Sequence, residues 1–527
     1  MLRAAGVALG VTSIYLFWLL VPLISLTHDA IYHWDGPWFE LFAVPILDFC
    51  LFWLLLTLVL FFARGRVRIA IWCGIIALTP WIELNNWSSL SQKFIPFWLS
   101  ALVLGVGVSA FPLLLALRRS KFEEKFGQIE GFATAVFVFS AFCGILTLSR
   151  YAWIGWEART LNAQLPLHDE AHNRQAQAER PRVIWILFDE LSYQQVYGRR
   201  FPGLQLPAFD ALAAQATVFT HTIPAGIRTE LVLPSLLTSE PVDRIRASPD
   251  GRQLKMHDPQ TGAWQQFDEH DTVFQDALNL NYRTAVAGWY NPYCRILPDV
   301  LDNCFWSYDS SANNAMAPEG SSGSNLMQPW MHLFRDGLGY RVASLFLNIS
   351  GQNDIDGEEH ISDYLALVKA ADRILEDEST GFALIHMPIP HPNGIYDRQS
   401  GKFSVKHSDY LDNVALADKF LGHVRSKLEQ NGQWDASTIV VMADHSWRTT
   451  AGWKNSPEWT EEEEIASQGG QFDDRPAYIV KLPEQHTGAR IDTPFAAIDT
   501  RRLLDGLLSQ KIRSKEELAE WAIKFGK

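Results

Sequence analysis

Basic residues are in the minority in this chain of 527 residues. Lysine and arginine total 45, against 59 aspartates and glutamates, so the formal net charge is -14. A protein that binds nucleic acid needs positive charge gathered along one face, and no basic stripe occurs in the polar part of this sequence. No internal repeat is found either. The composition therefore argues against a nucleic-acid partner.

Cysteine is also scarce, with five residues in the whole chain. Cys50, Cys73 and Cys143 lie in apolar segments, where cysteine is typically a small buried hydrophobic residue. Cys294 and Cys304 flank a short polar loop, and an oxidising compartment would let them pair. No further cysteine or nearby histidine accompanies them, which disfavours a zinc site. We predict a disulfide between these two residues.

The first 150 residues contain few charges and several long apolar stretches. Most of these stretches are long enough to cross about 30 Å of hydrocarbon as helices. A cleavable signal peptide is the alternative for the first stretch, but four more follow it and no cleavage site of small residues stands out. We therefore predict a transmembrane domain of five spans over residues 1–150, with spans near 5–26, 42–63, 69–82, 94–117 and 131–149.

The positions of the basic residues predict the orientation of these spans, because lysine and arginine near span ends stay on the cytoplasmic side. Three basic groups lie before span one, after span two and after span four: Arg3; Arg64, Arg66 and Arg68; Arg118, Arg119 and Lys121. With five spans, everything that follows lies outside the cytoplasm. We predict an amphipathic juxtamembrane linker over 151–181 and an extracytoplasmic domain over 182–527.

Apolar runs typical of buried strands alternate with helical patterns from residue 182 onward. This alternation predicts an α/β sandwich with a mostly parallel central sheet. Two of the predicted strands end in pairs of side chains that can bind a metal, Asp189-Glu190 and Asp444-His445. Reactive groups gather at strand ends in such sheets, and these side chains suit a divalent metal, zinc or manganese above all. Neighbouring strand residues point to opposite faces, so the part played by Glu190 stays open.

A hydroxyl nucleophile for this site is offered by Thr229, at the junction between a loop and an apolar helix. The N-terminus of a helix attracts an anionic phosphoryl group, and a neighbouring metal would lower the pKa of the hydroxyl. The alternative is that Thr229 only caps the helix.

The order of these residues along the chain resembles the sulfatase-like branch of the alkaline phosphatase superfamily. The set comprises Asp189, Thr229 with Pro234 and Leu236-Leu237-Thr238, the run from His386 to His391, and Asp444-His445. The likeness covers roughly residues 182 to 508, and the ordered set is more specific than any single motif. It implies that Asp189, Thr229, Asp444 and His445 bind one divalent metal and that Thr229 is also the nucleophile.

The resemblance also implies roles for the remaining residues of the set. His391 would contact the phosphate or act as an acid or base, whereas His386 would be structural. Glu190 matches a position that is acidic in relatives with two carboxylate ligands, so it remains open as a further ligand. Arg228, Arg448 and Lys454 are candidates for binding phosphate, each with the alternative of an ordinary surface charge. Ser446 stands where many relatives have glycine, and the Trp447-Arg448 pair after it is unusual.

A threonine nucleophile disfavours sulfate ester hydrolysis, because true sulfatases use a modified cysteine or serine. The combination of five spans with a threonine nucleophile is instead similar to lipoteichoic acid synthases and lipid A phosphoethanolamine transferases. This similarity implies a multi-pass protein of the bacterial plasma (inner) membrane with a periplasmic or extracellular catalytic domain. Its donor would be a membrane phospholipid, and a phosphoethanolamine or phosphoglycerol head group would pass through a phospho-threonine to an envelope glycolipid or glycan.

Two alternatives remain open in the sequence. The first uses the same residues with water as acceptor, which gives a membrane-anchored phosphodiesterase or phosphatase. The second is a non-catalytic envelope protein that keeps the fold. The joint presence of Asp189, Thr229, Asp444 and His445 argues against the second alternative.

Overall fold

The computed structural model describes most of the chain and divides it into two compact units. The described residues are 1–15, 32, 38–91, 119–157, 180–248, 253–308, 352–456 and 458–525. The first unit comprises Met1–Ile31, Gly36–Leu161 and Asn314–Ile349, and the second comprises Tyr32–Asp35, Asn162–Asn313 and Ser350–Lys527.

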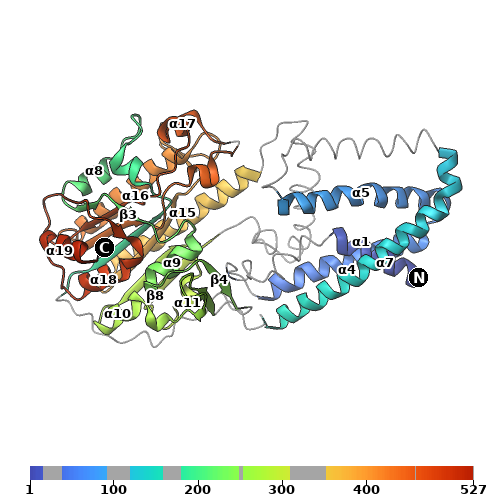
Figure 1. The fold of residues 1–527 in the computed structure, drawn as a ribbon, viewed down its shortest axis with the longest axis horizontal. Helices are drawn as coiled ribbons and strands as arrows, with labels where there is room; N and C mark the ends of the chain where they lie inside the picture. Colours follow the sequence, from blue (N-terminus) through green and yellow to red (C-terminus); the bar gives the residue numbers. More distant parts are fainter. Residues whose placement is uncertain are drawn as a thin grey trace. The chain divides into compact units, whose positions relative to one another are not determined.

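The first unit is helical where it is described. Its helices are α1 (Leu2–Tyr15), α4 (Trp38–Phe62), α5 (Gly65–Ser91) and α7 (Arg119–Glu157) (Figure 1). A Cβ added to Gly10 of α1 would lie only 1.7 Å from the carbonyl oxygen of Phe137 in α7. Only glycine permits such a close approach, so small residues bring these two helices together.

One helical segment in the described residues, Glu124–Glu157, is long and apolar enough to cross a membrane. The segments Leu2–Tyr15 and Phe49–Phe62 are apolar but shorter. The five predicted spans are therefore not supported, and the described helices support a single span that would serve as a membrane anchor or a signal. The predicted spans 5–26 and 94–117 lie partly and wholly outside the described residues, as does most of the predicted linker.

The second unit is built on a sheet of eight strands, in which β13 runs antiparallel to its neighbours and the other seven strands share one direction. The prediction of a mostly parallel sheet is thereby confirmed. In order across the sheet, the strands are β14 (Ala489–Ile491), β2 (Thr217–Phe219), β13 (Tyr478–Lys481), β12 (Thr438–Ala443), β1 (Val183–Asp189), β9 (Phe382–Pro390), β7 (Thr284–Trp289) and β8 (Asn303–Ser307).

Helices cover both faces of this sheet, as Figure 1 shows. Because successive strand residues point to opposite faces, Ile184, Ile186 and Phe188 of β1 pack in one core and the residues between them pack in the other. The first core includes α8 (Pro207–Ala213), α15 (Gln352–Glu376) and α16 (Tyr410–Gln430). The second includes α9 (Thr229–Thr238), α10 (Val273–Asn279), α18 (Thr500–Leu508) and α19 (Lys515–Phe525).

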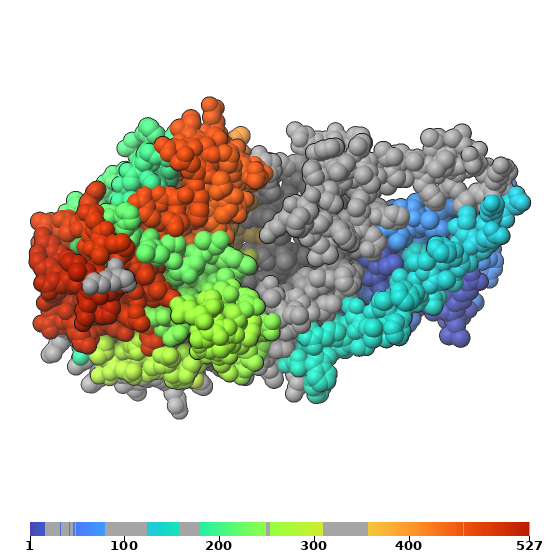
Figure 2. Space-filling model, viewed as in Figure 1, coloured from blue at the N-terminus to red at the C-terminus, as the bar shows by residue number. Residues whose placement is uncertain are grey.

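Smaller elements connect these layers. A three-stranded sheet of β4 (Arg244–Ala247), β5 (Leu254–His257) and β6 (Trp264–Gln266) lies partly exposed at the surface, among the light green atoms of Figure 2. Two further pairs join β3 (Thr222–Ile223) to β15 (Phe495–Ala496) and β10 (Tyr396–Asp397) to β11 (Lys402–Phe403). The short helical elements are Gln194–Gly198, Glu269–Asp271, α11 (Tyr293–Ile296), Thr449–Trp453, α17 (Glu461–Ala466) and Ala497–Asp499.

Candidate active site

The candidate site lies where β1 and β12 end side by side. The two strands are parallel and paired through Phe188 and Ala443, so the next residues, Asp189 and Asp444, reach the same edge of the sheet. Both carboxylates are fully buried. The oxygen Oδ1 of Asp444 accepts hydrogen bonds from the backbone N–H groups of Glu190, at 3.0 Å, and His445, at 2.7 Å. These bonds fix the Asp444 carboxylate between the two strand ends.

Thr229 reaches both carboxylates from the start of α9. Its hydroxyl lies 3.1 Å from Oδ2 of Asp189 and 2.8 Å from Oδ2 of Asp444. Arg228, not Thr229, occupies the N-cap position, and its side chain makes no capping bond. The Thr229 hydroxyl is therefore directed at the carboxylates and does not cap the helix.

These side chains form a cluster that fits a divalent cation. Burial, and then the charges of Asp444 and Glu190, raise the pKa of Asp189 well above its ordinary value. His445 contributes Nε2, at 3.3 Å from Oδ2 of Asp444 and 3.9 Å from Oδ1 of Asp189. This nitrogen and Oδ1 of Asp189 are buried and have no hydrogen-bond partner. Unpaired carboxylate and imidazole lone pairs that converge in a buried site match the ligand set of zinc or manganese.

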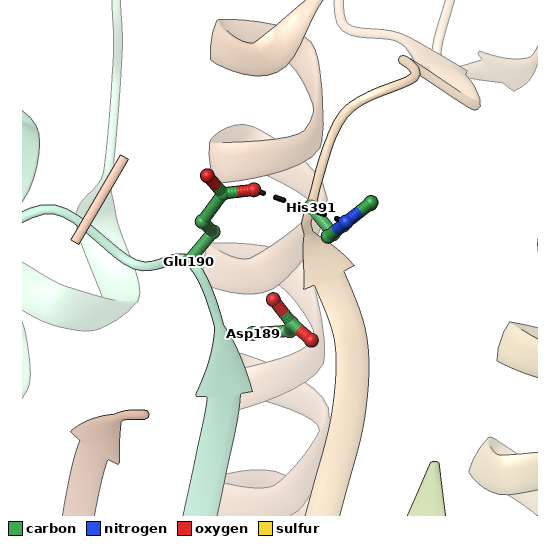
Figure 3. Close-up of side chains that lie close together, drawn as sticks. All are labelled: Asp189, Glu190 and His391. Atoms are coloured by element: carbon green, nitrogen blue, oxygen red, sulfur yellow. Dashed lines mark ion pairs between the residues drawn. The ribbon is translucent and has the colours of Figure 1, made fainter. Parts of the chain in front are cut away.

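Glu190 joins the site through an unusual backbone conformation. Its φ is +69°, and the pairing of β1 with β9 shifts register between Phe188 and Asp189. This change of direction at the strand end turns both neighbouring carboxylates toward the same region, as Figure 3 shows. The alternation rule that left Glu190 open therefore does not hold at this strand end.

Glu190 is held by hydrogen-bond donors from one segment. The carboxylate accepts from Nε of Arg448 at 2.7 Å, from the Arg448 backbone N–H at 2.8 Å and from Nε1 of Trp453 at 2.8 Å. Burial raises the pKa of Glu190, but the charge of Arg448 and its hydrogen bond outweigh this effect and lower the pKa to about 2. Glu190 is therefore ionised and paired with arginine.

His391 follows β9 and lies beside the Glu190 pair. Its Nε2 is 3.2 Å from Nη2 of Arg448 and 4.0 Å from Oε2 of Glu190, the contact drawn in Figure 3. The rings of Trp289 and Trp453 flank it at 5.5 and 5.2 Å. Burial lowers the pKa of His391 to about 3, although Glu190 opposes the shift. A neutral imidazole that accepts from Arg448 suits a base or a lone-pair ligand better than an acid, and the predicted roles of His391, phosphate contact or acid–base catalysis, stay predictions.

The other candidate residues have partners of their own. Arg228 pairs with Glu230 and is mostly exposed, and Lys454 pairs with Glu464 and the carbonyl of Gly469. The structure therefore brings Arg448 into the site but gives Lys454 other partners, and phosphate binding by these residues stays a prediction. His386 is buried, with Nδ1 at 2.9 Å from the Tyr293 hydroxyl. Cys294 and Cys304 form a disulfide.

Two residues of the site were missed in the sequence. The buried hydroxyl of Tyr410 donates to the Glu190 carbonyl at 2.9 Å and accepts from the Ser192 N–H at 3.1 Å. Its ring stacks on Trp447 at 4.2 Å. Trp453 donates to Glu190 from a single helical turn, which is too short to be predicted from hydrophobic periodicity. The unusual Trp447-Arg448 pair was the one available signal, since both residues contact this part of the site.

A comparison with models of protein families shows the family to which the chain belongs. The family model described as "Sulfatase" matches residues 181–477, more than half of the chain. A search of curated proteins finds no match.

Similar solved structures share little sequence with this chain. A phosphonate monoester hydrolase of Agrobacterium radiobacter has a TM-score of 0.39 and 15% identity over 63% of this chain and 74% of its own. The sulfatase PsFucS1 from Pseudoalteromonas sp. has a TM-score of 0.41 and 15% identity over 63% and 69%. Murine ectonucleotide pyrophosphatase/phosphodiesterase 5 has a TM-score of 0.34 and 10% identity over 65% and 99%.

These scores are low, so the solved structures add no argument to the family match. The matched region contains β1, Thr229, His391 and the end of β12 with Asp444 and His445, which are the elements that build the buried cluster. The chain is therefore an enzyme of the sulfatase family.

Proposed function

We propose that this enzyme is a metal-dependent membrane phosphotransferase. It would move a phosphoethanolamine or phosphoglycerol head group from a phospholipid to an acceptor of the cell envelope, through a phospho-threonine intermediate. The observation that carries the proposal is the position of the Thr229 hydroxyl, at 3.1 and 2.8 Å from two buried carboxylates of the cation cluster. A purely structural role would not explain why this hydroxyl lies next to unpaired atoms that can bind a metal, whereas a nucleophile activated by the metal would lie there.

Asp189, Thr229, Asp444 and His445 are the residues that would hold the metal. When bound, the metal would lower the pKa of the Thr229 hydroxyl and offset the charge of the phosphoryl oxygens. The chain itself positions the nucleophile, since Thr229 is the first residue of α9 and its side chain is buried. It also keeps bulk water away from the carboxylates, which strengthens electrostatic interactions with the transferred group.

The proposed reaction has two transfers. In the first, Oγ1 of Thr229 gives up its proton and forms a bond to the phosphorus, the bond from phosphorus to the diacylglycerol oxygen breaks, and that oxygen takes up a proton as it leaves. In the second, the acceptor oxygen loses its proton and bonds to phosphorus, the bond to Thr229 breaks, and Oγ1 of Thr229 takes up a proton. Asp444 is placed to accept the Thr229 proton, because its Oδ2 already pairs with the hydroxyl.

The membrane part of the proposal is that helices of the first unit contact lipid, with Glu124–Glu157 as the span that the described residues support. The support for lipid contact is the exposed apolar surface of two helices. On α7, Phe132, Phe139 and Phe142 expose 74%, 70% and 60% of their surface, and α4 exposes Leu54, Leu55 and Phe62. Contiguous apolar side chains on the surface of a helix are typical of contact with lipid. The disulfide between Cys294 and Cys304 supports an oxidising, extracytoplasmic compartment for the second unit.

The test is to follow both products from defined vesicles. The purified full chain is incubated with manganese or zinc and with vesicles that contain phosphatidylethanolamine and phosphatidylglycerol labelled in their head groups. The proposal predicts diacylglycerol release that requires metal, and label that appears on an added envelope glycolipid. Label found only as free head-group phosphate would favour the hydrolase alternative. No diacylglycerol from any phospholipid would contradict the proposal.

The variants Thr229→Ala and Thr229→Ser complete this experiment. The alanine variant should release no diacylglycerol, whereas the serine variant keeps an oxygen nucleophile and should retain part of the activity. Release by the alanine variant at the wild-type rate would exclude Thr229 as the nucleophile.

A further inference from the structure

A second group of metal-ligand atoms lies beside the first and shares Asp189 with it. Oxygen and nitrogen atoms of Asp189, Glu190 and His391 all lie within 4.8 Å of one another, as do those of Asp189, Asp444 and His445. Figure 3 shows that the second group gathers side chains from the ends of β1 and β9. By residue type and spacing alone, the site has ligands for two neighbouring cations.

Arg448 already binds the lone pairs that a second metal would need. Its Nε and Nη2 donate to the two oxygens of Glu190 at 2.7 and 3.2 Å, and its backbone N–H adds a third bond at 2.8 Å. Its Nη2 also lies 3.2 Å from Nε2 of His391. A metal would use these same carboxylate oxygens and this same imidazole nitrogen. The guanidinium and a second metal are therefore mutually exclusive.

The charges of the combined cluster lead to the same conclusion. Asp189, Glu190 and Asp444 are three fully buried carboxylates, and Arg448 supplies one positive charge. Two negative charges remain when all three carboxylates are ionised, which a single divalent cation balances. With Arg448 in place, a second divalent cation would leave an excess of two positive charges in the cluster. The first group also retains unpaired atoms, Oδ1 of Asp189 and Nε2 of His445, whereas both oxygens of Glu190 are bonded.

We infer that Arg448 is a built-in cation that occupies the second metal position, so that the enzyme binds one divalent ion and becomes a two-metal protein when the guanidinium is removed. The inference rests on the metal site of the proposed function. In this inference Glu190 pairs with Arg448 and is not a metal ligand. The inference also explains why an arginine, Arg448, stands in the unusual segment after His445. Arg448 is then a positioning residue that holds Glu190 and His391 in place.

The test counts bound metal and needs no substrate. The purified full chain is saturated with manganese, freed of excess by gel filtration in detergent and measured by native mass spectrometry together with elemental analysis. Wild type should carry one equivalent and Arg448→Met two. Trp453 still donates to Glu190 in this variant, so the carboxylate stays in place. The double variant Arg448→Met with Glu190→Gln should return to one equivalent, because the second ligand set has lost its carboxylate.

A matched control is Arg475→Met. Arg475 also binds one carboxylate through two nitrogens, with Nε and Nη2 at 2.9 and 2.7 Å from the oxygens of Asp473. Its side chain is 25% exposed, against 20% for Arg448, but it touches neither ligand group. This variant should carry one equivalent, like wild type.

Several outcomes would overturn the inference. Two equivalents of manganese on the wild-type protein would overturn it, and this result does not depend on whether Arg448→Met folds. A folded Arg448→Met protein with one equivalent would show that the arginine excludes no metal. No metal on wild type would remove the first site as well, and the proposed function with it. One equivalent on wild type and two on Arg448→Met would uphold the inference even if no head-group transfer were ever detected.

Discussion

The hydroxyl of Tyr410 provides a sharp test of how the site is held. It donates to the carbonyl of Glu190 at 2.9 Å and accepts from the N–H of Ser192 at 3.1 Å, and all three groups are buried. Tyr410→Phe removes this oxygen but keeps the ring that stacks on Trp447 at 4.2 Å. The variant therefore leaves two buried backbone groups without partners.

The size of the effect follows from those two groups. Each unpaired buried group costs about 1–3 kcal/mol, so the two together cost at least about 2 kcal/mol. The Tyr410 hydroxyl also holds Glu190 at a φ of +69°, a conformation that costs about 1–3 kcal/mol in a residue other than glycine. Once released, Glu190 can relax and displace Asp189, its neighbour in the cation cluster. If metal binding must restore this conformation, the cost of about 1–3 kcal/mol lowers metal affinity by about 5-fold to 150-fold, since 1.4 kcal/mol is a factor of ten.

The assay is a competition titration of manganese against a chelator of known affinity, on the full chain in detergent. Tyr478→Phe is the matched control, because Tyr478 is equally buried and its hydroxyl lies 3.3 Å from Oγ1 of Thr500, in a contact that includes no ligand of the cluster. Tyr410→Phe should weaken metal binding and Tyr478→Phe should not. Equal affinities in the two variants, with both proteins folded, would refute the assigned role of Tyr410.

Three further predictions concern the metal, the pH dependence and the cysteines. Chelation should lower the thermal midpoint of the second unit, because the free energy of unfolding falls by about 2.7 kcal/mol relative to protein with metal at one hundred times its Kd. Calorimetry that shows no change in the midpoint would exclude a resident cation. Because the folded pKa of Asp189 is raised above its unfolded value of about 4, the metal-free protein should lose stability as pH rises through that folded pKa, and the loss should disappear in Asp189→Asn. Alkylation without reductant after denaturation should label Cys50, Cys73 and Cys143 but not Cys294 or Cys304, and labelling of all five would contradict the disulfide.

The sheet and the main ligand residues could be predicted because the sequence signals them locally. The strands that end at Asp189 and Ala443 are apolar and β-branched, and the parallel sheet brings their ends together. The helix that starts at Thr229 follows from its apolar run. Such signals depend on neighbours in the sequence, so a single chain is enough to find them.

The parts that could not be predicted depend on distant residues or on backbone details. The partnership of Glu190 with Arg448 joins residues 258 positions apart, and it also needs the positive φ of Glu190. Tyr410 and Trp453 enter the site through tertiary packing, and neither has a local signal for this role. The five-span prediction rested on apolar length alone, whereas the described helices include one segment of sufficient length and hydropathy.

The most direct test of the account is peptide mapping of Thr229 after incubation with phospholipid. The purified chain is exposed to mixed phospholipids without acceptor, quenched in acid and analysed as an intact protein and as peptides by mass spectrometry. The account predicts one covalent adduct on Thr229, with the mass of a phosphoethanolamine or phosphoglycerol group, and none on Thr229→Ala. An adduct on another residue, or diacylglycerol release by Thr229→Ala at the wild-type rate, would contradict it.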